Sequence, residues 1–370
     1  MAPKRLSGAG AFPNAVDTPA PKTPDSGPLY AALDLGTNSC RMLIAQPKGN
    51  QFVVVDSFSK SVQLGSGLEA TGTLSRASIK RTIQALRICR KKLQNHNVTR
   101  MRLVATEACR RAKNSQEFHQ LVKRETGLTL EIIKPEEEAR LAVISCAPLV
   151  SVRTEQLLVV DIGGGSTELV WIDISKVPYK ERPRSIMRLH SGFKQDHTMP
   201  ENARVVDWIS VPLGVATLRD IFDDVEDDSA RFALMSCHFE ENLAGFSPFA
   251  REQAKEGFQI VGTSGTVTTV AASHLGLKRY DRNKVDGLMM TSGEIDTVVR
   301  DYLALGPEGR RTDPRIGRDR QALIMSGAAI LQALLRVWPT DRLSVADRGL
   351  REGLLYAQMS ADGVLTDGIT

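Results

Sequence analysis

Two short segments of the sequence combine an aspartate with a glycine-rich turn and hydroxyl side chains. They are residues 34–39 (Asp-Leu-Gly-Thr-Asn-Ser) and 161–167 (Asp-Ile-Gly-Gly-Gly-Ser-Thr). Glycines let the backbone approach a phosphate closely, so that successive N–H groups can point at the anion. A carboxylate beside such a turn can hold a hydrated divalent cation. We expect metal or metal-water ligands in Asp34 and Asp161, and phosphate-binding groups in Gly36, Thr37, Asn38, Ser39, Gly163, Gly164, Gly165, Ser166 and Thr167.

A third segment, residues 260–266, again places glycines and hydroxyls after an apolar strand and at the start of a helix. Backbone N–H groups and the helix dipole favour anions at such a position. Its candidate phosphate-binding residues are Gly262, Ser264, Gly265 and Thr266. A strand followed by glycines can also be an ordinary hairpin turn, so one such loop is weak evidence. Three of them favour a phosphate-filled cleft.

Two successive sets of strands and helices are predicted to position these loops. Alternating and helical apolar spacings predict the first set in the order βββαβαβα. Its strands are expected at 29–33, 40–45, 51–58, 101–105 and 128–133, and its helices at 75–93, 115–125 and 135–145. In the second set, strands are expected at 157–161, 168–172, 185–189, 208–211, 258–262 and 343–346, and helices at 213–222, 228–244, from 264 and at 350–359.

The repeated order predicts two tandem α/β domains, residues 29–150 and 151–370, with the last helix a candidate to pack back on the first domain. Residues 1–28 are rich in proline and read as a disordered tail. The polar segment 180–206 is a candidate lid or partner surface, although ordinary loop variability would also explain it.

Composition narrows the class of protein. No apolar run reaches the ~20 residues of a membrane span, and no secretory signal opens the chain, which favours a cytoplasmic protein without membrane contact. The five cysteines are scattered and read as reduced thiols. Residues 76–111 contain eleven Lys and Arg but one Glu. This excess of positive charge would attract a polyanion. That stretch has no aromatic residue for base stacking, which argues against nucleic acid.

Together with residues 349–353 (Gly-Leu-Arg-Glu-Gly), the three loops resemble the ordered motifs of the Ppx/GppA family of exopolyphosphatases and guanosine pentaphosphatases. The resemblance covers nearly all of residues 29–360 and is to the short form of the family. It implies two RNase H-like domains of the actin-like type with an active-site cleft between them.

The resemblance also implies catalytic roles. Glu138, before Ala139 in a predicted helix, matches the family's catalytic glutamate and is expected to act as general base or to orient water. Glu168 matches the second acidic residue and is expected to position water or metal. Arg110 matches an arginine that contacts phosphate, and Arg41 is a weaker candidate for the same role. Without the resemblance, glutamates in a first helical turn merely complement the helix dipole.

The leading interpretation is a Mg²⁺-dependent exopolyphosphatase that removes terminal phosphate from inorganic polyphosphate, with Mn²⁺ as an alternative ion. Hydrolysis of guanosine pentaphosphate is the closest alternative. A non-catalytic regulator that binds (p)ppGpp or polyphosphate is the second. A kinase of the same fold is disfavoured because Glu138 and Glu168 would direct water at the phosphorus. A homodimer is expected only because symmetric dimers are common among soluble enzymes.

Overall fold

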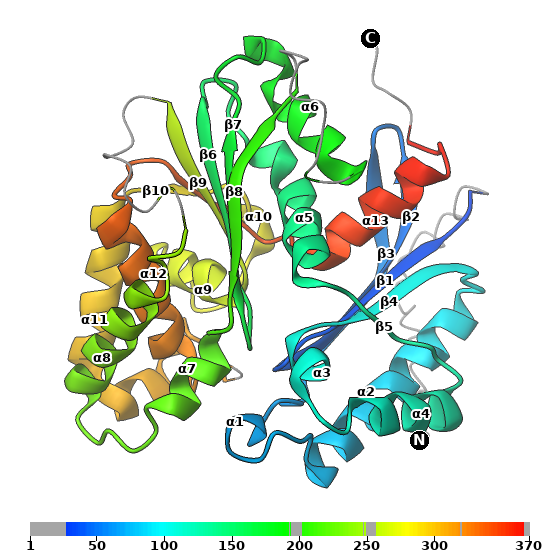
Figure 1. The fold of residues 1–370 in the computed structure, drawn as a ribbon, viewed down its shortest axis with the longest axis horizontal. Helices are drawn as coiled ribbons and strands as arrows, with labels where there is room; N and C mark the ends of the chain where they lie inside the picture. The colour runs from blue at the N-terminus through cyan, green and yellow to red at the C-terminus, as the bar shows by residue number, and fades with distance from the viewer. Residues whose placement is uncertain are drawn as a thin grey trace, which may run out of the picture.

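A computed structural model describes residues 27–191, 193, 202–246, 248, 257–318 and 320–365. The predicted tail 1–28 lies almost wholly outside this part of the chain, as does the middle of segment 180–206. The described residues form two α/β domains, each built on its own mixed sheet (Figure 1). None of the described helices is both long and apolar enough to cross a bilayer.

The sheet of the first domain has the strand order β3-β2-β1-β4-β5. Its strands are β1 (Tyr30–Leu35), β2 (Ser39–Lys48), β3 (Gln51–Ser61), β4 (Arg100–Ala105) and β5 (Glu131–Ile132). The accompanying helices are α1 (Leu68–Thr71), α2 (Arg76–Asn95), α3 (Glu107–Arg111), α4 (Ser115–Thr126) and α5 (Pro135–Cys146). Sequence-encoded caps set the ends of two helices: the Ser75 hydroxyl accepts the Ser78 N–H at the start of α2, and Gly127 ends α4 with φ of 70°.

The sheet of the second domain has the order β10-β11-β9-β6-β7-β8. Its strands are β6 (Gln156–Ile162), β7 (Thr167–Asp173), β8 (Arg204–Val211), β9 (Phe258–Thr263), β10 (Met289–Met290) and β11 (Leu343–Ala346). Its helices are α6 (Arg182–Met187), α7 (Val215–Ile221), α8 (Asp228–Glu241), α9 (Gly265–His274), α10 (Arg282–Val285), α11 (Ser292–Thr312), α12 (Ile324–Val337) and α13 (Leu350–Ala361). The described residues also form the 3₁₀ turns η1 (Ala147–Leu149), η2 (Tyr179–Glu181) and η3 (Arg188–Ser191).

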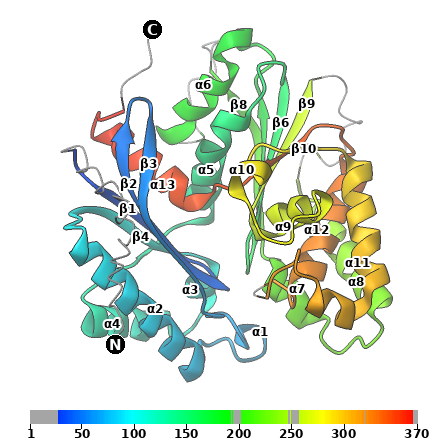
Figure 2. The same cartoon turned by 180° about the vertical axis from the view of Figure 1, so that it is seen from behind.

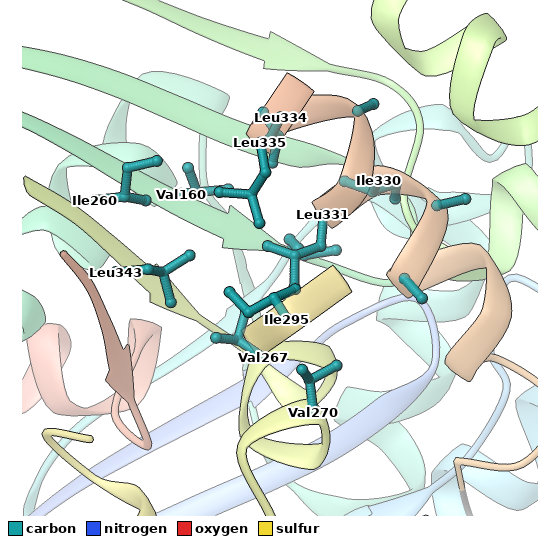
Figure 3. Close-up of a cluster of buried hydrophobic side chains, with 14 of the residues drawn as sticks. Val160, Ile260, Val267, Val270, Ile295, Ile330, Leu331, Leu334, Leu335 and Leu343 are labelled. Carbon is teal, nitrogen blue, oxygen red and sulfur yellow. The ribbon is translucent and has the colours of Figure 1, made fainter. Parts of the chain in front are cut away.

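The larger apolar core of the second domain lies between its sheet and helices α8, α9, α11 and α12. Figure 3 shows this contact: Val160, Ile260 and Leu343 from the sheet meet branched side chains of the helices. The labelled helix residues are Val267, Val270, Ile295, Ile330, Leu331, Leu334 and Leu335. These side chains are buried, so strands β6 and β9 are held firmly against the helices. The loops that follow these two strands are therefore held in position as well.

Helices α5 and α13 lie between the two sheets (Figures 1 and 2). The C-terminal helix α13 follows the second sheet in sequence yet packs against α5 and against β1 of the first sheet. The crossing of α13 and α5 is close because Gly353 has no side chain: a Cβ there would lie 2.1 Å from the Leu141 carbonyl oxygen. The last glycine of the Gly-Leu-Arg-Glu-Gly motif therefore allows close packing between a helix of the second domain and a helix of the first.

The sequence placed most elements within a few residues of their observed bounds. The strand expected at 185–189 was wrong, because this segment forms α6 and η3. Pro183 in the first turn of α6 suits a helix start, and Ile186 and Leu189, three residues apart, are both buried on one side. Helices α11 and α12 were not predicted at all, and of the strand expected at 128–133 only β5 is formed.

Candidate active site

A cleft of about 250 Å³ opens between the two domains. It is lined by the three predicted loops and by the residues that connect β11 to α13. The predicted site residues on its surface are Asp34, Gly36, Thr37, Asn38, Ser39, Arg41, Glu138, Asp161, Gly163, Gly164, Gly165, Ser166, Ser264, Gly265 and Thr266. Four others, Arg110, Thr167, Glu168 and Gly262, are not among the lining residues.

The first two loops are equivalent hairpins. In one, the Gly36 N–H donates to the Ser39 carbonyl at 2.9 Å; in the other, the Gly163 N–H donates to the Ser166 carbonyl at the same distance. The aspartate before each turn pairs across the hairpin with a charged residue, but the charges differ. Asp34 lies opposite Arg41, whereas Asp161 lies opposite Glu168. The duplication thus pairs one aspartate with a cation and the other with an anion.

These two loops also pack directly on each other. A Cβ at Gly165 would lie 2.4 Å from Thr37 Oγ1, and one at Gly164 would lie 3.1 Å from the Asn38 backbone nitrogen. The glycines are therefore needed for contact between the domains as well as for approach to a ligand. The Thr37 hydroxyl is buried and has no hydrogen-bond partner in the structure. A buried unpaired hydroxyl is costly, and a phosphate oxygen would satisfy it.

The third loop holds a strained residue. Ser264 adopts φ 118° and ψ 178°, a region that is almost reserved for glycine. Its hydroxyl accepts the Thr266 N–H at 3.2 Å and so caps helix α9. Ser264 directly precedes the ten-residue helix α9, and the N-terminus of this helix lies at the cleft. The free N–H groups of a helix N-terminus favour an anion.

Glu138 lies in the first turn of helix α5, within a buried cluster of charged groups. Its side chain pairs with Arg110 at 2.7 Å, and Arg110 also binds Glu107 at 2.8 Å. Arg110 also donates to the Ile133 carbonyl. The guanidinium is thus committed to these protein groups, and it holds the Glu138 carboxylate in place.

Burial raises the pKa of Glu138 well above its usual range, and repulsion from Glu168 raises it further. The Arg110 guanidinium opposes this shift. Glu168 itself is buried behind the second loop, where its Oε1 accepts hydrogen bonds from the hydroxyls of Ser166 at 2.7 Å and Ser210 at 2.9 Å. Burial also raises the pKa of Glu168, against the effect of these hydrogen bonds. Two carboxyl groups of raised pKa therefore lie together at the domain junction.

Comparisons with known proteins agree with this geometry. The sequence profile of the Ppx/GppA phosphatase family matches residues 43–362. The chain belongs to the Ppx/GppA phosphatase family. It is similar to a Ppx/GppA family protein of Aquifex aeolicus, at 30% identity and a TM-score of 0.69 over 90% of this chain and 98% of that one. The fold also matches an exopolyphosphatase of Cytophaga hutchinsonii, at 21% identity and a TM-score of 0.73, with 91% and 100% of the two chains covered.

A curated relative is the guanosine-5'-triphosphate,3'-diphosphate pyrophosphatase of Aeromonas salmonicida. The two sequences are 29% identical over 332 residues, which cover 90% of this chain. The matched region is 59% of the length of that relative. This member of the Ppx/GppA family therefore corresponds to a part of its longer relatives.

Asp34 and Asp161 suit a hard divalent cation in this Ppx/GppA site. Burial and repulsion from Glu168 and Asp34 raise the pKa of Asp161 to about 7, and burial raises the pKa of Asp34 as well. A cation would relieve the repulsion between these carboxylates. No group of three or more His, Cys, Asp or Glu side chains is arranged as a metal cage among the described residues. Magnesium does not require one, because it binds through one or two carboxylates, water and substrate phosphate.

Three arginines in the cleft were not predicted as site residues from the sequence. Arg320, Arg348 and Arg351 all line it. Arg348 and Arg351 follow β11. The three loops were predicted because polar residues follow an apolar strand, and the same signal could have predicted these two arginines. Arg320 precedes α12 without any local pattern. Its guanidinium lies so close to the start of α9 that a Cβ at Gly265 would be 1.3 Å from Nη1.

Two of the predicted phosphate-binding residues have a structural role instead of a place on the cleft surface. The Thr167 hydroxyl donates to the Leu213 carbonyl at 2.8 Å and is fully buried. Gly262 packs against Val267, whose methyl groups would lie 3.2 Å from a Cβ at that position. Both residues hold the second and third loops in place from behind.

Proposed function

We propose that this protein hydrolyses a terminal phosphoanhydride bond, with guanosine 5'-triphosphate 3'-diphosphate (guanosine pentaphosphate) as the substrate. The observation that carries the proposal is the position of Glu138, a buried carboxyl at a cleft lined by three phosphate-type loops. The curated relative named above points to this substrate rather than to inorganic polyphosphate.

In the proposed reaction, Glu138 accepts a proton from the attacking water. A general base works best when its pKa lies near the working pH, and the raised pKa of Glu138 moves it in that direction. Arg110 holds the carboxylate through a 2.7 Å contact, which limits its rotation. Backbone N–H groups of the loops, with Arg41 and Arg351, would face the charge that develops on the phosphoryl oxygens.

We further propose that Mg²⁺, or Mn²⁺ in its place, is held by Asp34 and Asp161, with Glu168 behind them. A bound divalent ion neutralises phosphate charge during phosphoryl transfer. The residues on this chain supply the hard oxygen donors and keep them at the base of the cleft. The predicted cytoplasmic location and the predicted homodimer stay predictions.

Inorganic polyphosphate is the second candidate substrate. It is favoured by the basic character of the first domain, where Lys80 and Lys91 project from α2 into solvent. One neighbour, Arg87, is partly neutralised because it pairs with Glu125 at 2.8 Å. These cations could hold the distal part of a long polyanion by charge alone.

The test is orthophosphate release by the purified protein from guanosine pentaphosphate, long polyphosphate and ATP at matched concentrations, with Mg²⁺ and with EDTA. We expect the highest kcat/KM for guanosine pentaphosphate and loss of activity in EDTA. A higher kcat/KM for polyphosphate would make the second candidate the function. Absence of release from all three substrates would contradict hydrolysis and favour a binding protein.

A further inference from the structure

The segment between α9 and α10 carries an aromatic side chain that the reaction described above does not use. Tyr280 is 48% exposed and is not itself one of the residues that line the cleft. In Figure 2 this segment, in yellow, lies on the side of the second domain that faces the first. A half-exposed aromatic ring at the edge of a polar, phosphate-type cleft calls for an explanation, because phosphate gains nothing from a ring face.

The Tyr280 hydroxyl is directed toward the cleft. It lies close enough to Asp347 and Thr268, both of which line the cleft, for these side chains to affect its pKa. The neighbouring Arg282 fixes the same segment, since its Nη2 donates to the Asp347 carbonyl at 2.6 Å and lies 3.5 Å from Glu352 Oε1. The polar end of Tyr280 is thus held at the cleft while much of its side chain stays open to solvent.

The position of this hydroxyl relative to the third loop can be estimated from α9. Thr268 is four residues beyond Ser264, about one helical turn or roughly 5–6 Å along the helix. The Tyr280 hydroxyl therefore lies about one turn from the phosphate-type loop. A ribose and its first phosphate separate a nucleobase from the remaining phosphates by a distance of this order, so one ligand could contact both places.

We propose that Tyr280 is a stacking platform for the purine base of the nucleotide whose phosphates occupy the cleft. This inference rests on the proposed function, because it names how the nucleotide part of that substrate is recognised. Base stacking on an aromatic ring is tolerant of geometry and requires only an exposed face held in place. Lys278 and Arg279 are exposed on the same segment, and Lys284 is exposed on the adjoining α10. Together they give a positive field suited to the 3'-diphosphate.

The test compares Tyr280→Ala and Tyr280→Phe with the wild-type protein on two substrates, guanosine pentaphosphate and inorganic tripolyphosphate. Tyr179→Ala is the matched control, because Tyr179 is equally exposed (50%) and its ring contacts Arg182, which does not line the cleft. For Tyr280→Ala we expect KM for guanosine pentaphosphate to rise about tenfold with little change in kcat, as for the loss of one stacking contact. KM for tripolyphosphate should stay within about twofold. Tyr280→Phe should keep most of the affinity, since the ring remains.

A direct binding measurement separates this inference from the proposed function. Calorimetric titration with guanosine tetraphosphate should show about tenfold weaker binding to Tyr280→Ala and unchanged binding to Tyr179→Ala. This holds whether or not any substrate is hydrolysed. Equal loss of affinity for guanosine tetraphosphate and tripolyphosphate would assign Tyr280 a structural role and overturn the inference. Unchanged affinity of Tyr280→Ala for guanosine tetraphosphate would overturn it too.

Discussion

Replacement of Glu138 by glutamine separates its chemical role from its structural one. Glutamine has nearly the same shape but cannot accept a proton from water. A positioned general base contributes about 10²–10⁴-fold to a rate, which corresponds to about 3–5 kcal/mol of activation free energy. We therefore expect Glu138→Gln to lower kcat for phosphate release by at least about a hundredfold.

The stability of the same variant should change little. Removal of one partner from a buried ion pair usually costs about 3–5 kcal/mol, because the other charge is left uncompensated. Here Arg110 keeps Glu107, which accepts from both Nε and Nη2. The glutamine carbonyl can also accept from Nη1 in place of the carboxylate. The buried charge of Glu138, which its raised pKa shows to be unfavourable, is removed. We expect the free energy of unfolding in urea to stay within about 1 kcal/mol of wild type.

The control lies next to it on the same helix. Glu137 is more exposed and pairs with Arg102 at 3.0 Å and with Arg140 at 3.4 Å. Since such pairs contribute about 0–1 kcal/mol, Glu137→Gln should leave kcat within about twofold of wild type. Steady-state phosphate release and urea unfolding are measured on both variants. A Glu138→Gln protein that is folded and keeps a tenth or more of wild-type kcat would refute the general-base role.

Three further predictions concern the frame of the site. Gly353→Ala should lower the free energy of unfolding by about 3 kcal/mol in urea, because its Cβ would meet the backbone of α5 at 2.1 Å. Gly293→Ala is the neutral control, because its Cβ would only reach ordinary contact with Thr291 Oγ1 at 3.9 Å. Ser264→Gly should raise that free energy by about 1 kcal/mol by releasing backbone strain, and a decrease would argue against strain. The pKa of Asp161 is raised from 3.8 to about 7, so its contribution to stability is full below pH 4 and is lost as pH rises through 7. Without divalent cations, Asp161→Asn should therefore lose less stability than wild type between pH 5 and 8, by at most about 3 kcal/mol, and equal losses would contradict the shift.

The loops could be predicted from sequence because their chemistry is local. A glycine-rich turn after an apolar strand constrains its own backbone, so the segments at 34–39 and 161–167 are recognisable without any partner. The short helix α6 could not be told from a strand, because a brief apolar run fits either period and packing against α5 decides the outcome. Arg320 is a similar case, since only the fold brings it to the start of α9.

The burial of Glu138 could not be predicted from local sequence patterns either. The sequence shows Glu138 in a first helical turn, where solvent exposure is the ordinary expectation. The groups around Glu138 come from distant parts of the chain: Arg110 from α3 pairs with it, and Glu168 from the second domain raises its pKa. The raised pKa of Glu138 is therefore a property of the contact between domains, and no window of local sequence contains it.

The duplication of the fold explains how one cleft can serve both binding and hydrolysis. Two hairpins with the same backbone hydrogen bond carry Arg41 in one copy and Glu168 in the other at the equivalent cross-strand position. Arg41 partly offsets the burial of Asp34, so this copy favours an anionic ligand. Glu168 adds to the repulsion at Asp161 and Glu138, so this copy favours a cation and a proton acceptor. Because like charges opposite each other are destabilising, Glu168 costs stability in the free protein. The proposed cation and substrate would offset that cost, which would give a physical reason for the different charges in the two copies.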